Sequence, residues 1–195
     1  MNSDALFGAT AIVLARLGAK VVAIDVKDGN VAVSQANAAK HGESVTFQHV
    51  ADSRALPFPS CAFMAITCVS VLEYVKRDHL PDVLRELDRV LAPGGVVLIQ
   101  GTSNRISPME AHSRRWFVNW LPHWIMPSLK RGIWPGQIAF EGYENLALAD
   151  NDQAYLLARK AGPIVRTTAR VAHAFGKPIG YFTPSIYLAL KKIRT

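Results

Sequence analysis

Two acidic residues, Asp25 and Asp52, follow predicted strands and could bind a polar ligand through hydrogen bonds. Asp25 lies near the end of the apolar run 20–26, and Gly8 lies 17 residues before it (25 minus 8). In nucleotide-binding α/β folds, a glycine at the start of the first helix lets the backbone approach the ligand, and an acid about 20 residues later accepts hydrogen bonds from ribose hydroxyls. The alternative for Gly8 is a glycine in an ordinary turn.

Asp52 and Ser53 come just after a second predicted strand, residues 44–50. A carboxylate just past the carboxyl end of a parallel strand lies at the edge of the sheet where ligands bind, and it can accept a hydrogen bond from an exocyclic amine. The alternative is a turn residue or a helix N-cap. The residues by themselves therefore indicate a nucleotide-type ligand.

The elements that would position these residues alternate along the first hundred residues. Apolar positions recur with helical spacing in 9–18 and 80–91, and an alanine-rich helix is predicted to end near Gly42. The β-branched run at 20–26, the segment 44–50, the continuous apolar run at 62–69 and residues 96–100 are predicted to be strands. Strands alternating with helices predict an α/β fold with a parallel sheet covered on both faces.

The pattern changes after Gly101. Residues 103–145 contain all four tryptophans, several prolines and no convincing strand, which predicts a cap inserted into the domain. A helix is predicted from Asn151, and residues 164–168 and 185–190 could form the last strands, antiparallel at the edge of the sheet. We expect one domain over residues 1–195.

Four segments in this order resemble a known family. They are AIVLARLGAKVVAIDV, VADSRALPF, FMAITCVSVLEYV and LRELDRVLAPGGVVLI. Together they resemble the core of the class I S-adenosylmethionine-dependent methyltransferases, in the small-molecule branch related to ubiquinone-biosynthesis enzymes. The resemblance covers roughly residues 7–101 and implies a Rossmann-like fold.

The resemblance also implies roles for individual residues. Asp25, with Val26 beside it, would bind the ribose, and Asp52 with Ser53 would contact the adenine. Val69 and Ser70 would lie under the methionine part of S-adenosylmethionine. Gly8 matches the last glycine of the family's glycine-rich loop.

The first six residues, MNSDAL, depart from the family pattern. The family begins with a strand and a GxGxG loop at this point, whereas MNSDAL has no β-branched residue and contains Asn and Asp, which strands disfavour. We therefore expect an N-terminal truncation that removes most of the first strand. In the family that strand lies between the strands ending at Asp25 and near Val69, so each of these two should have an unpaired edge.

The cap contains a candidate for the catalytic base. Methyl transfer to oxygen or nitrogen needs orientation and a base, and His112 in the cap is the candidate because imidazole titrates near neutral pH. A hydrogen-bonded loop histidine is the alternative reading of His112, and Glu73 is an alternative base. The histidines have no partners at ligand spacing, so no metal site is predicted.

The aromatic part of the cap permits three interpretations. It could form a wall of the acceptor pocket, it could contact lipid headgroups through residues 114–134, or it could pack as a lid on its own domain. Trp116 and Trp120 are one helical turn apart and would share a helix face.

Charge and composition exclude several other classes of protein. Residues 1–100 carry 9 Lys/Arg against 10 Asp/Glu, and residues 101–195 carry 13 against 5, so the net charge of +7 belongs to the second half. Two cysteines cannot form a disulfide framework, and no apolar run approaches the roughly 20 residues of a membrane span. A cytoplasmic location is predicted.

We expect methyl transfer from S-adenosylmethionine to a small-molecule or lipid-like acceptor. One alternative is a non-catalytic remnant that has lost cofactor binding. A nucleic-acid methyltransferase is less favoured, because Val69-Ser70-Val71-Leu72-Glu73-Tyr74 does not resemble the Asn/Asp-Pro-Pro-Tyr/Phe motif of base-modifying enzymes.

Overall fold

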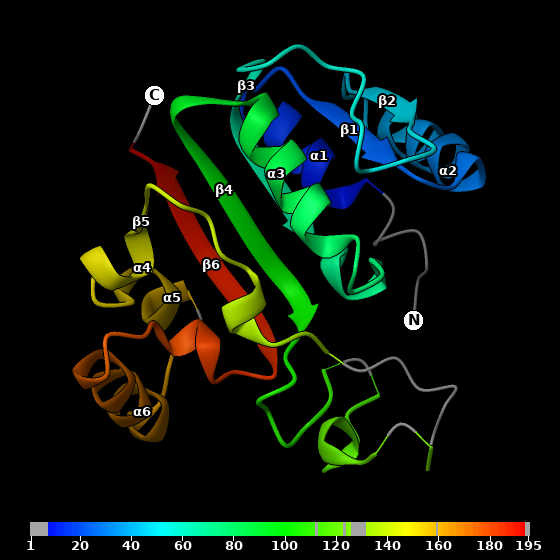
Figure 1. Ribbon diagram of the computed structural model, residues 1–195. Helices are drawn as coiled ribbons and strands as arrows, with labels where there is room; N and C mark the ends of the chain where they lie inside the picture. Colours follow the sequence, from blue (N-terminus) through cyan, green and yellow to red (C-terminus); the bar gives the residue numbers. More distant parts are fainter. Residues whose placement is uncertain (1–7, 112, 123, 126–131, 159, 194–195) are drawn as a thin grey trace. The chain divides into compact units, whose positions relative to one another are not determined.

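The computed structural model describes residues 8–111, 113–122, 124–125, 132–158 and 160–193. The chain forms two compact units, residues 1–57 and residues 58–195, and each is described by itself. Figure 1 gives the element labels used below.

The first unit contains a two-stranded parallel sheet and two helices. The elements are α1 (Ala9–Arg16), β1 (Val22–Asp25), α2 (Asp28–Lys40) and β2 (Thr46–His49). The two strands pair from Val22 opposite Thr46 to Asp25 opposite His49. Helix α2 contacts both strands and buries Val31, Ser34 and Ala38 on one face. The predicted helices and strands of this region are confirmed, with boundaries shifted by a few residues.

The second unit contains a four-stranded mixed sheet. Its strands are β3 (Phe63–Val69), β4 (Leu91–Ser103), β5 (Tyr143–Asn145) and β6 (Ser185–Lys192). The order across the sheet is β3-β4-β6-β5, with β3 and β4 parallel and β6 antiparallel to both of its neighbours. The α-helices are α3 (Leu80–Val90), α4 (Leu146–Ala149), α5 (Gln153–Ala158) and α6 (Pro163–Ala174). Short 3-10 turns are η2 (Leu72–Tyr74), η3 (Val118–Trp120), η4 (Pro135–Gln137) and η5 (Ile179–Tyr181).

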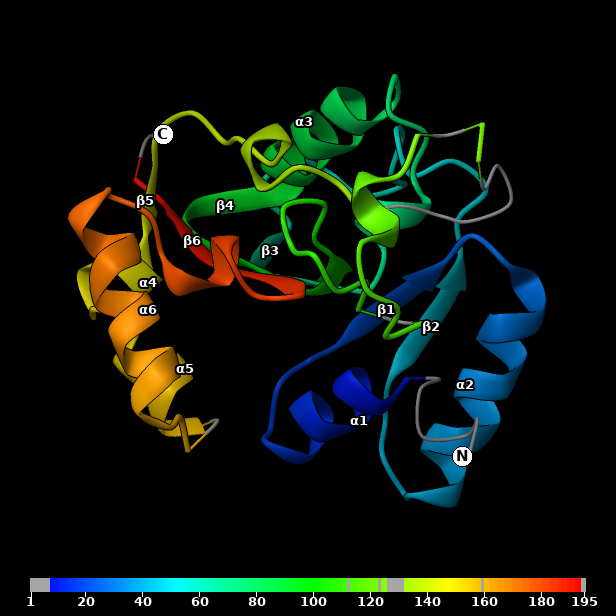
Figure 2. The ribbon, with the colours of Figure 1, turned by 90° about the horizontal axis from the view of Figure 1, so that it is seen from below.

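Helices lie on both faces of this sheet. Figure 2 shows α3 on one face and α4, α5 and α6 on the other. The buried side chains of α3 recur at helical spacing, at Leu80, Val83, Leu84 and Leu87, and give the helix one apolar face. On β4, Val97 and Ile99 are fully buried, as expected for a central strand covered by helices.

Two strands have an unpaired edge within the described part of the chain. There, β1 is hydrogen-bonded to β2 alone, and β3 is hydrogen-bonded to β4 alone. These are the strands ending at Asp25 and Val69, for which the family pattern predicted unpaired edges.

Several details differ from the sequence prediction. Strand β5 (Tyr143–Asn145) lies within residues 103–145, where no strand was predicted. Residues 164–168 were predicted as a strand but belong to helix α6, which starts at Pro163 and buries Ala169 and Ala172. Strand β6 confirms the prediction for 185–190, but it lies between β4 and β5 rather than at the edge. Strand β4 begins at Leu91, before the Pro-Gly-Gly segment, because the ladder with β3 has an irregularity there that accommodates the extra residues.

Candidate functional site

Asp25 is held in a defined position at the carboxyl end of β1. Its Oδ1 accepts the backbone N–H of Lys27 at 2.8 Å, and its Oδ2 accepts the side-chain amide of Asn30 at 3.0 Å. Each carboxylate oxygen has a further lone pair, so the group can still accept hydrogen bonds from a ligand. The next residue, Val26, has an exposed side chain, and its carbonyl oxygen lies 3.2 Å from the His49 ring nitrogen Nε2.

Asp52 and Ser53 lie in the turn after β2, at the same edge of the two-stranded sheet as Asp25. The Asp52 carboxylate forms an ion pair with Arg54, 2.7 Å between Oδ2 and Nη2, and its Oδ1 accepts the Arg54 backbone N–H. The pair is nearly half exposed to solvent, so it adds little to the free energy of unfolding. Its main effect is to fix the orientation of the Asp52 carboxylate. A ligand amine that binds the Asp52 carboxylate would therefore lie beside the Arg54 guanidinium.

Gly8 begins helix α1 in a conformation that favours glycine. Its φ is +73°, in the left-handed region. A Cβ at this position would lie 3.1 Å from the ring of Phe47 on β2 and 3.3 Å from the Cβ of Ser34 on α2. Both the backbone angle and the close packing therefore require a residue without a side chain.

In the second unit, Val69 and Ser70 lie at the carboxyl end of β3. Ser70 has a φ of +52°, and its backbone N–H donates to the Gln100 carbonyl at 2.9 Å. Its hydroxyl donates to the Gly101 carbonyl at 3.2 Å. A Cβ on Gly101 would lie 2.5 Å from the Ser70 hydroxyl oxygen, so the glycine permits the close approach of these two strand ends.

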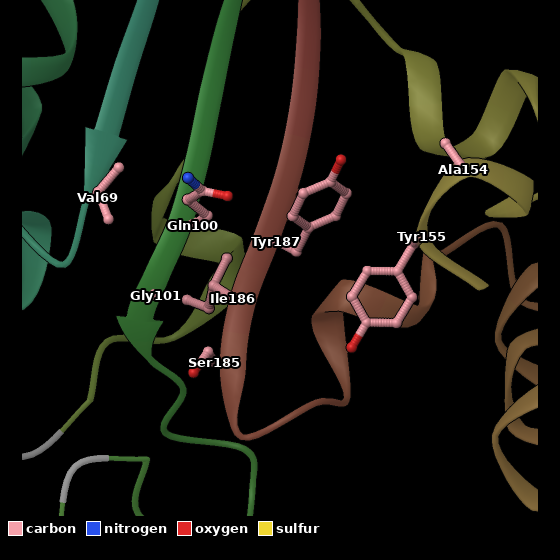
Figure 3. A pocket seen from close by; sticks show the side chains of 8 residues that line it. All are labelled: Val69, Gln100, Gly101, Ala154, Tyr155, Ser185, Ile186 and Tyr187. Atoms are coloured by element: carbon pink, nitrogen blue, oxygen red, sulfur yellow. The ribbon is translucent and has the colours of Figure 1, made fainter. Parts of the chain in front are cut away.

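A cavity of about 440 Å³ opens beside these strand ends. Figure 3 shows its lining residues, which come from the ends of β3 and β4, the start of β6, and α5. They are Val69, Gln100, Gly101, Ala154, Tyr155, Ser185, Ile186 and Tyr187. The volume falls within the range of about 300–1,000 Å³ typical of small-molecule sites.

Two tyrosines form an aromatic wall of the cavity. The ring centroids of Tyr155 and Tyr187 are 5.3 Å apart, with the ring planes at 44°. Burial, with the charges of Asp150 and Asp152 and the neighbouring Tyr155, raises the pKa of Tyr187. The Tyr187 hydroxyl therefore keeps its proton at neutral pH and can act as a hydrogen-bond donor.

A buried carboxylate that contacts a histidine lies directly before the helix that carries Tyr155. Asp152 is fully buried, and its Oδ2 accepts Nε2 of His173 at 2.7 Å and the backbone N–H of Ile179 at 2.7 Å. His173 is on α6, Ile179 begins η5, and Asp152 immediately precedes α5. This carboxylate thus connects three elements that support one side of the cavity.

The predicted base His112 lies outside the described residues. Two residues before it, Glu110 is buried; it accepts a hydrogen bond from the Ser103 hydroxyl at 2.9 Å and one from the Ser113 backbone N–H at 2.6 Å. The predicted helix with Trp116 and Trp120 on one face does not form. Trp116 makes a β-bridge with Met109, and Trp120 ends the 3-10 turn η3.

The structure gathers the predicted residues into two groups, one in each unit. Asp25, Val26, Asp52 and Ser53 lie at the carboxyl edge of the two-stranded sheet, and Val69 and Ser70 lie at the carboxyl edge of β3 and β4. The sequence did not indicate Tyr155, Ser185 or Tyr187 as lining residues. The β4–β6 ladder places Ser185 and Tyr187 beside the end of β4, and the contact between the Tyr155 and Tyr187 rings adds Tyr155 from α5.

Comparison with known protein families gives a match to the methyltransferases over the first half of the chain. Residues 7–95 match the family model described as a methyltransferase domain. The matched segment runs from the start of α1 into β4, and it contains every predicted cofactor residue named above. The match covers 89 of the 195 residues, from 7 to 95, and supports a class I S-adenosylmethionine-dependent methyltransferase.

The chain is similar to a curated protein of Maricaulis maris (strain MCS10), a ubiquinone biosynthesis O-methyltransferase. The two sequences are 28% identical over 112 residues, which is 56% of this chain and 43% of the relative. The chain thus spans less than half the length of that relative.

Solved structures agree with the fold of this chain. A putative methyltransferase from Bacillus halodurans C-125 matches with a TM-score of 0.59, at 18% identity, over 98% of this chain and 90% of that one. The [4+2]-cyclase SpnF matches with a TM-score of 0.56, at 21% identity, over 96% of this chain and 72% of that one. A protein named as a cyclase therefore shares this fold, and the reaction has to be argued from the site. None of the described helices is both long and apolar enough to cross a bilayer.

Proposed function

We propose that this methyltransferase transfers a methyl group from S-adenosylmethionine to an oxygen atom of a small-molecule or lipid-like acceptor. The observation that carries the proposal is the family match over residues 7–95, in which the candidate residues follow the carboxyl ends of successive strands. The name of the Maricaulis relative supports oxygen as the accepting atom. We further propose that residues 1–195 act as one domain with a cap at 103–145.

Asp25 is the residue on which cofactor binding depends most in this proposal. Its carboxylate is oriented by the Lys27 N–H and the Asn30 amide and has free lone pairs for two ribose hydroxyls, so it fits the group. Asp52 and Ser53 are assigned to the adenine, and Val69 and Ser70 to the methionine part. When bound, S-adenosylmethionine supplies a methyl group on a positively charged sulfur.

The acceptor is assigned to the cavity lined by Tyr155 and Tyr187. Two aromatic rings 5.3 Å apart suit a flat or apolar acceptor, and the protonated Tyr187 hydroxyl can donate a hydrogen bond to an acceptor oxygen. The Gln100 amide, also in the lining, can donate or accept. These groups would orient the acceptor, and orientation supplies much of the rate in displacement reactions.

His112 remains the proposed base. In oxygen methylation the methyl carbon would bond to the acceptor oxygen as its bond to the sulfonium sulfur breaks and S-adenosylhomocysteine leaves. An imidazole near neutral pH can take the proton that the acceptor hydroxyl loses. A His112→Ala variant should lower kcat while leaving cofactor affinity unchanged.

Calorimetric titration with S-adenosylhomocysteine tests the cofactor assignment. We expect binding by the unaltered chain, and at least a tenfold loss of affinity in Asp25→Ala because two hydrogen bonds to ribose are removed. Asp28→Ala is the matched control, because Asp28 begins α2 only three residues away. That variant should bind like the unaltered chain.

The absence of binding by a chain that still unfolds cooperatively would contradict the proposal and favour the non-catalytic remnant. Where binding is observed, transfer of radiolabelled methyl from S-adenosylmethionine to phenols, catechols and aliphatic amines would identify the accepting atom. Transfer to amines alone would contradict oxygen methylation.

A further inference from the structure

An exposed aromatic surface on the cap is not used by the proposed reaction. It consists of Trp116, Phe117, Trp120, Trp124, Ile125 and Trp134, and we refer to these six residues as the aromatic surface. Trp116 is 63% exposed, Trp120 56% and Trp124 80%. Single exposed apolar residues are common on proteins, but large apolar groups gathered in one region mark an interaction site.

Three of these side chains, Trp116, Phe117 and Trp120, are close to one another in space. The ring of Phe117 lies 6.1 Å from that of Trp116 and 5.7 Å from that of Trp120. The Trp120 indole N–H donates to the Ile106 carbonyl at 3.2 Å, and the neighbouring Arg105 stacks over Trp134 at 5.6 Å. Trp120 and Trp134, which are 14 residues apart in the chain, thus contact the neighbouring residues Ile106 and Arg105, just beyond β4.

The backbone holds these rings outward. Phe117 has a φ of +63°, a left-handed conformation that costs a bulky residue about 1–3 kcal/mol, and its ring is nevertheless exposed. Beneath it, the fully buried Asn119 side-chain amide donates to the Asn104 and Ser107 carbonyls, both at 3.0 Å. The Asn104 amide in turn donates to the Tyr181 and Thr183 carbonyls at 2.8 Å. A rigid polar base therefore presents exposed apolar rings, which a lid packed on its own domain would bury.

The charged side chains directly before Trp116 are positive. Residues 111–125 contain Arg114 and Arg115 and no Asp or Glu, and the preceding Glu110 is buried. Arg114 and Arg115 are exposed and directly precede Trp116. A partner of this region must therefore present apolar area together with negative charge.

We propose that the aromatic surface docks on an anionic phospholipid bilayer. Indole rings favour the membrane interface because they combine a large apolar body with a polar N–H, and arginines bind phosphate headgroups at the same depth. The inference goes beyond methyl transfer and does not depend on it. It gives the chain a position at the membrane, where a lipid-like acceptor would be found.

Tryptophan fluorescence tests this directly, because all four tryptophans of the chain belong to the aromatic surface. We expect vesicles of phosphatidylglycerol and phosphatidylcholine to shift the emission of the full chain to the blue and to protect it from acrylamide quenching. Pure phosphatidylcholine vesicles should have a much smaller effect. Sedimentation with the vesicles measures the affinity.

Two pairs of variants separate the contribution of the arginines to vesicle binding from that of the tryptophans. Arg114→Ala with Arg115→Ala should weaken binding to the anionic vesicles by about fivefold for each arginine, whereas Arg166→Ala with Arg170→Ala on α6 should not change it. Trp116→Ser with Trp124→Ser should abolish sedimentation. Phe175→Ser, at a residue 75% exposed but outside the aromatic surface, is the matched apolar control and should bind normally.

Two outcomes would overturn the proposal. One is a folded chain that fails to bind anionic vesicles, or that binds them equally well in the tryptophan variant. The other is self-association of the chain, seen by analytical ultracentrifugation and lost in the tryptophan variant without any vesicle binding, which would assign the aromatic surface to a second copy of the chain.

Discussion

At the scale of single residues, Gly8 has two structural roles that can be separated by mutation. Gly8→Ala should lower the free energy of unfolding by about 1–2 kcal/mol from the left-handed φ alone, and further because the new methyl group would crowd Phe47. Urea unfolding measures this loss.

Two glycines of the same unit serve as controls. Gly42 has a φ of +70° with open space around it, so Gly42→Ala should show the backbone cost alone. Gly29 lies in α2 with ordinary backbone angles and nothing near its Cβ position, so Gly29→Ala should stabilise by about 0.5 kcal/mol. Equal losses for Gly8→Ala and Gly42→Ala would show that packing against Phe47 contributes nothing.

The two cysteines differ in environment and should differ in reactivity. Cys61 is exposed, whereas Cys68 is buried in β3 and burial raises the pKa of its thiol to about 12. Because the thiolate is the reactive form, a disulfide reagent at pH 8 should modify one thiol rapidly and the second only after unfolding. The rapid phase should disappear in Cys61→Ser. Two rapid phases in the native chain would contradict the burial of Cys68.

At the scale of elements, the helical segment after β5 depends on a single buried carboxylate. Asp152→Ala removes the partner of both the His173 ring and the Ile179 N–H, and we expect a loss of about 3 kcal/mol in the free energy of unfolding. Asp150→Ala is the neighbouring control: Asp150 accepts the Ala154 N–H at 3.1 Å at an exposed position, so its loss should cost about 1 kcal/mol. Losses of equal size would show that the buried pair is not the support of this segment.

The same segment shows why one element could not be predicted from its residue types. Ile164, Val165, Thr167 and Thr168 have the β-branched composition of a strand, but Ile164 is 81% exposed and the buried residues Ala169 and Ala172 are three apart. Gly162 and Pro163 start a helix there, and the Thr168 hydroxyl donates to the Ile164 carbonyl within it. Tertiary burial of the alanine face outweighs the modest β-propensity of the branched residues.

At the scale of the whole molecule, stability should fall at alkaline pH. Burial raises the pKa of Cys68 and contributes to raised pKa values of Tyr143, Tyr181 and Tyr187. Groups with raised pKa values hold their protons longer in the folded state, so their stabilisation is complete below about pH 9 and decreases as the pH rises towards the folded pKa values.

Each such group contributes a slope of roughly 1.4 kcal/mol per pH unit while it is protonated only in the folded state. For Cys68 that window runs from its ordinary pKa of 9.0 to about 12. Urea unfolding at several pH values above 9 should therefore give a shallower decline for Cys68→Ala than for the unaltered chain. Parallel declines would contradict a raised pKa at Cys68.

The sequence by itself determined the alternation of helices and strands, the family, and the positions of Asp25, Asp52 and Val69 at strand ends, because these follow from short-range periodicity and from the order of motifs. Only the tertiary structure placed β6 between β4 and β5, which brings Tyr187 opposite Gln100 and creates the cavity. It also decided that the tryptophans of the cap are exposed rather than packed. Both outcomes depend on contacts between residues far apart in the chain, and local residue patterns carry little information about such contacts.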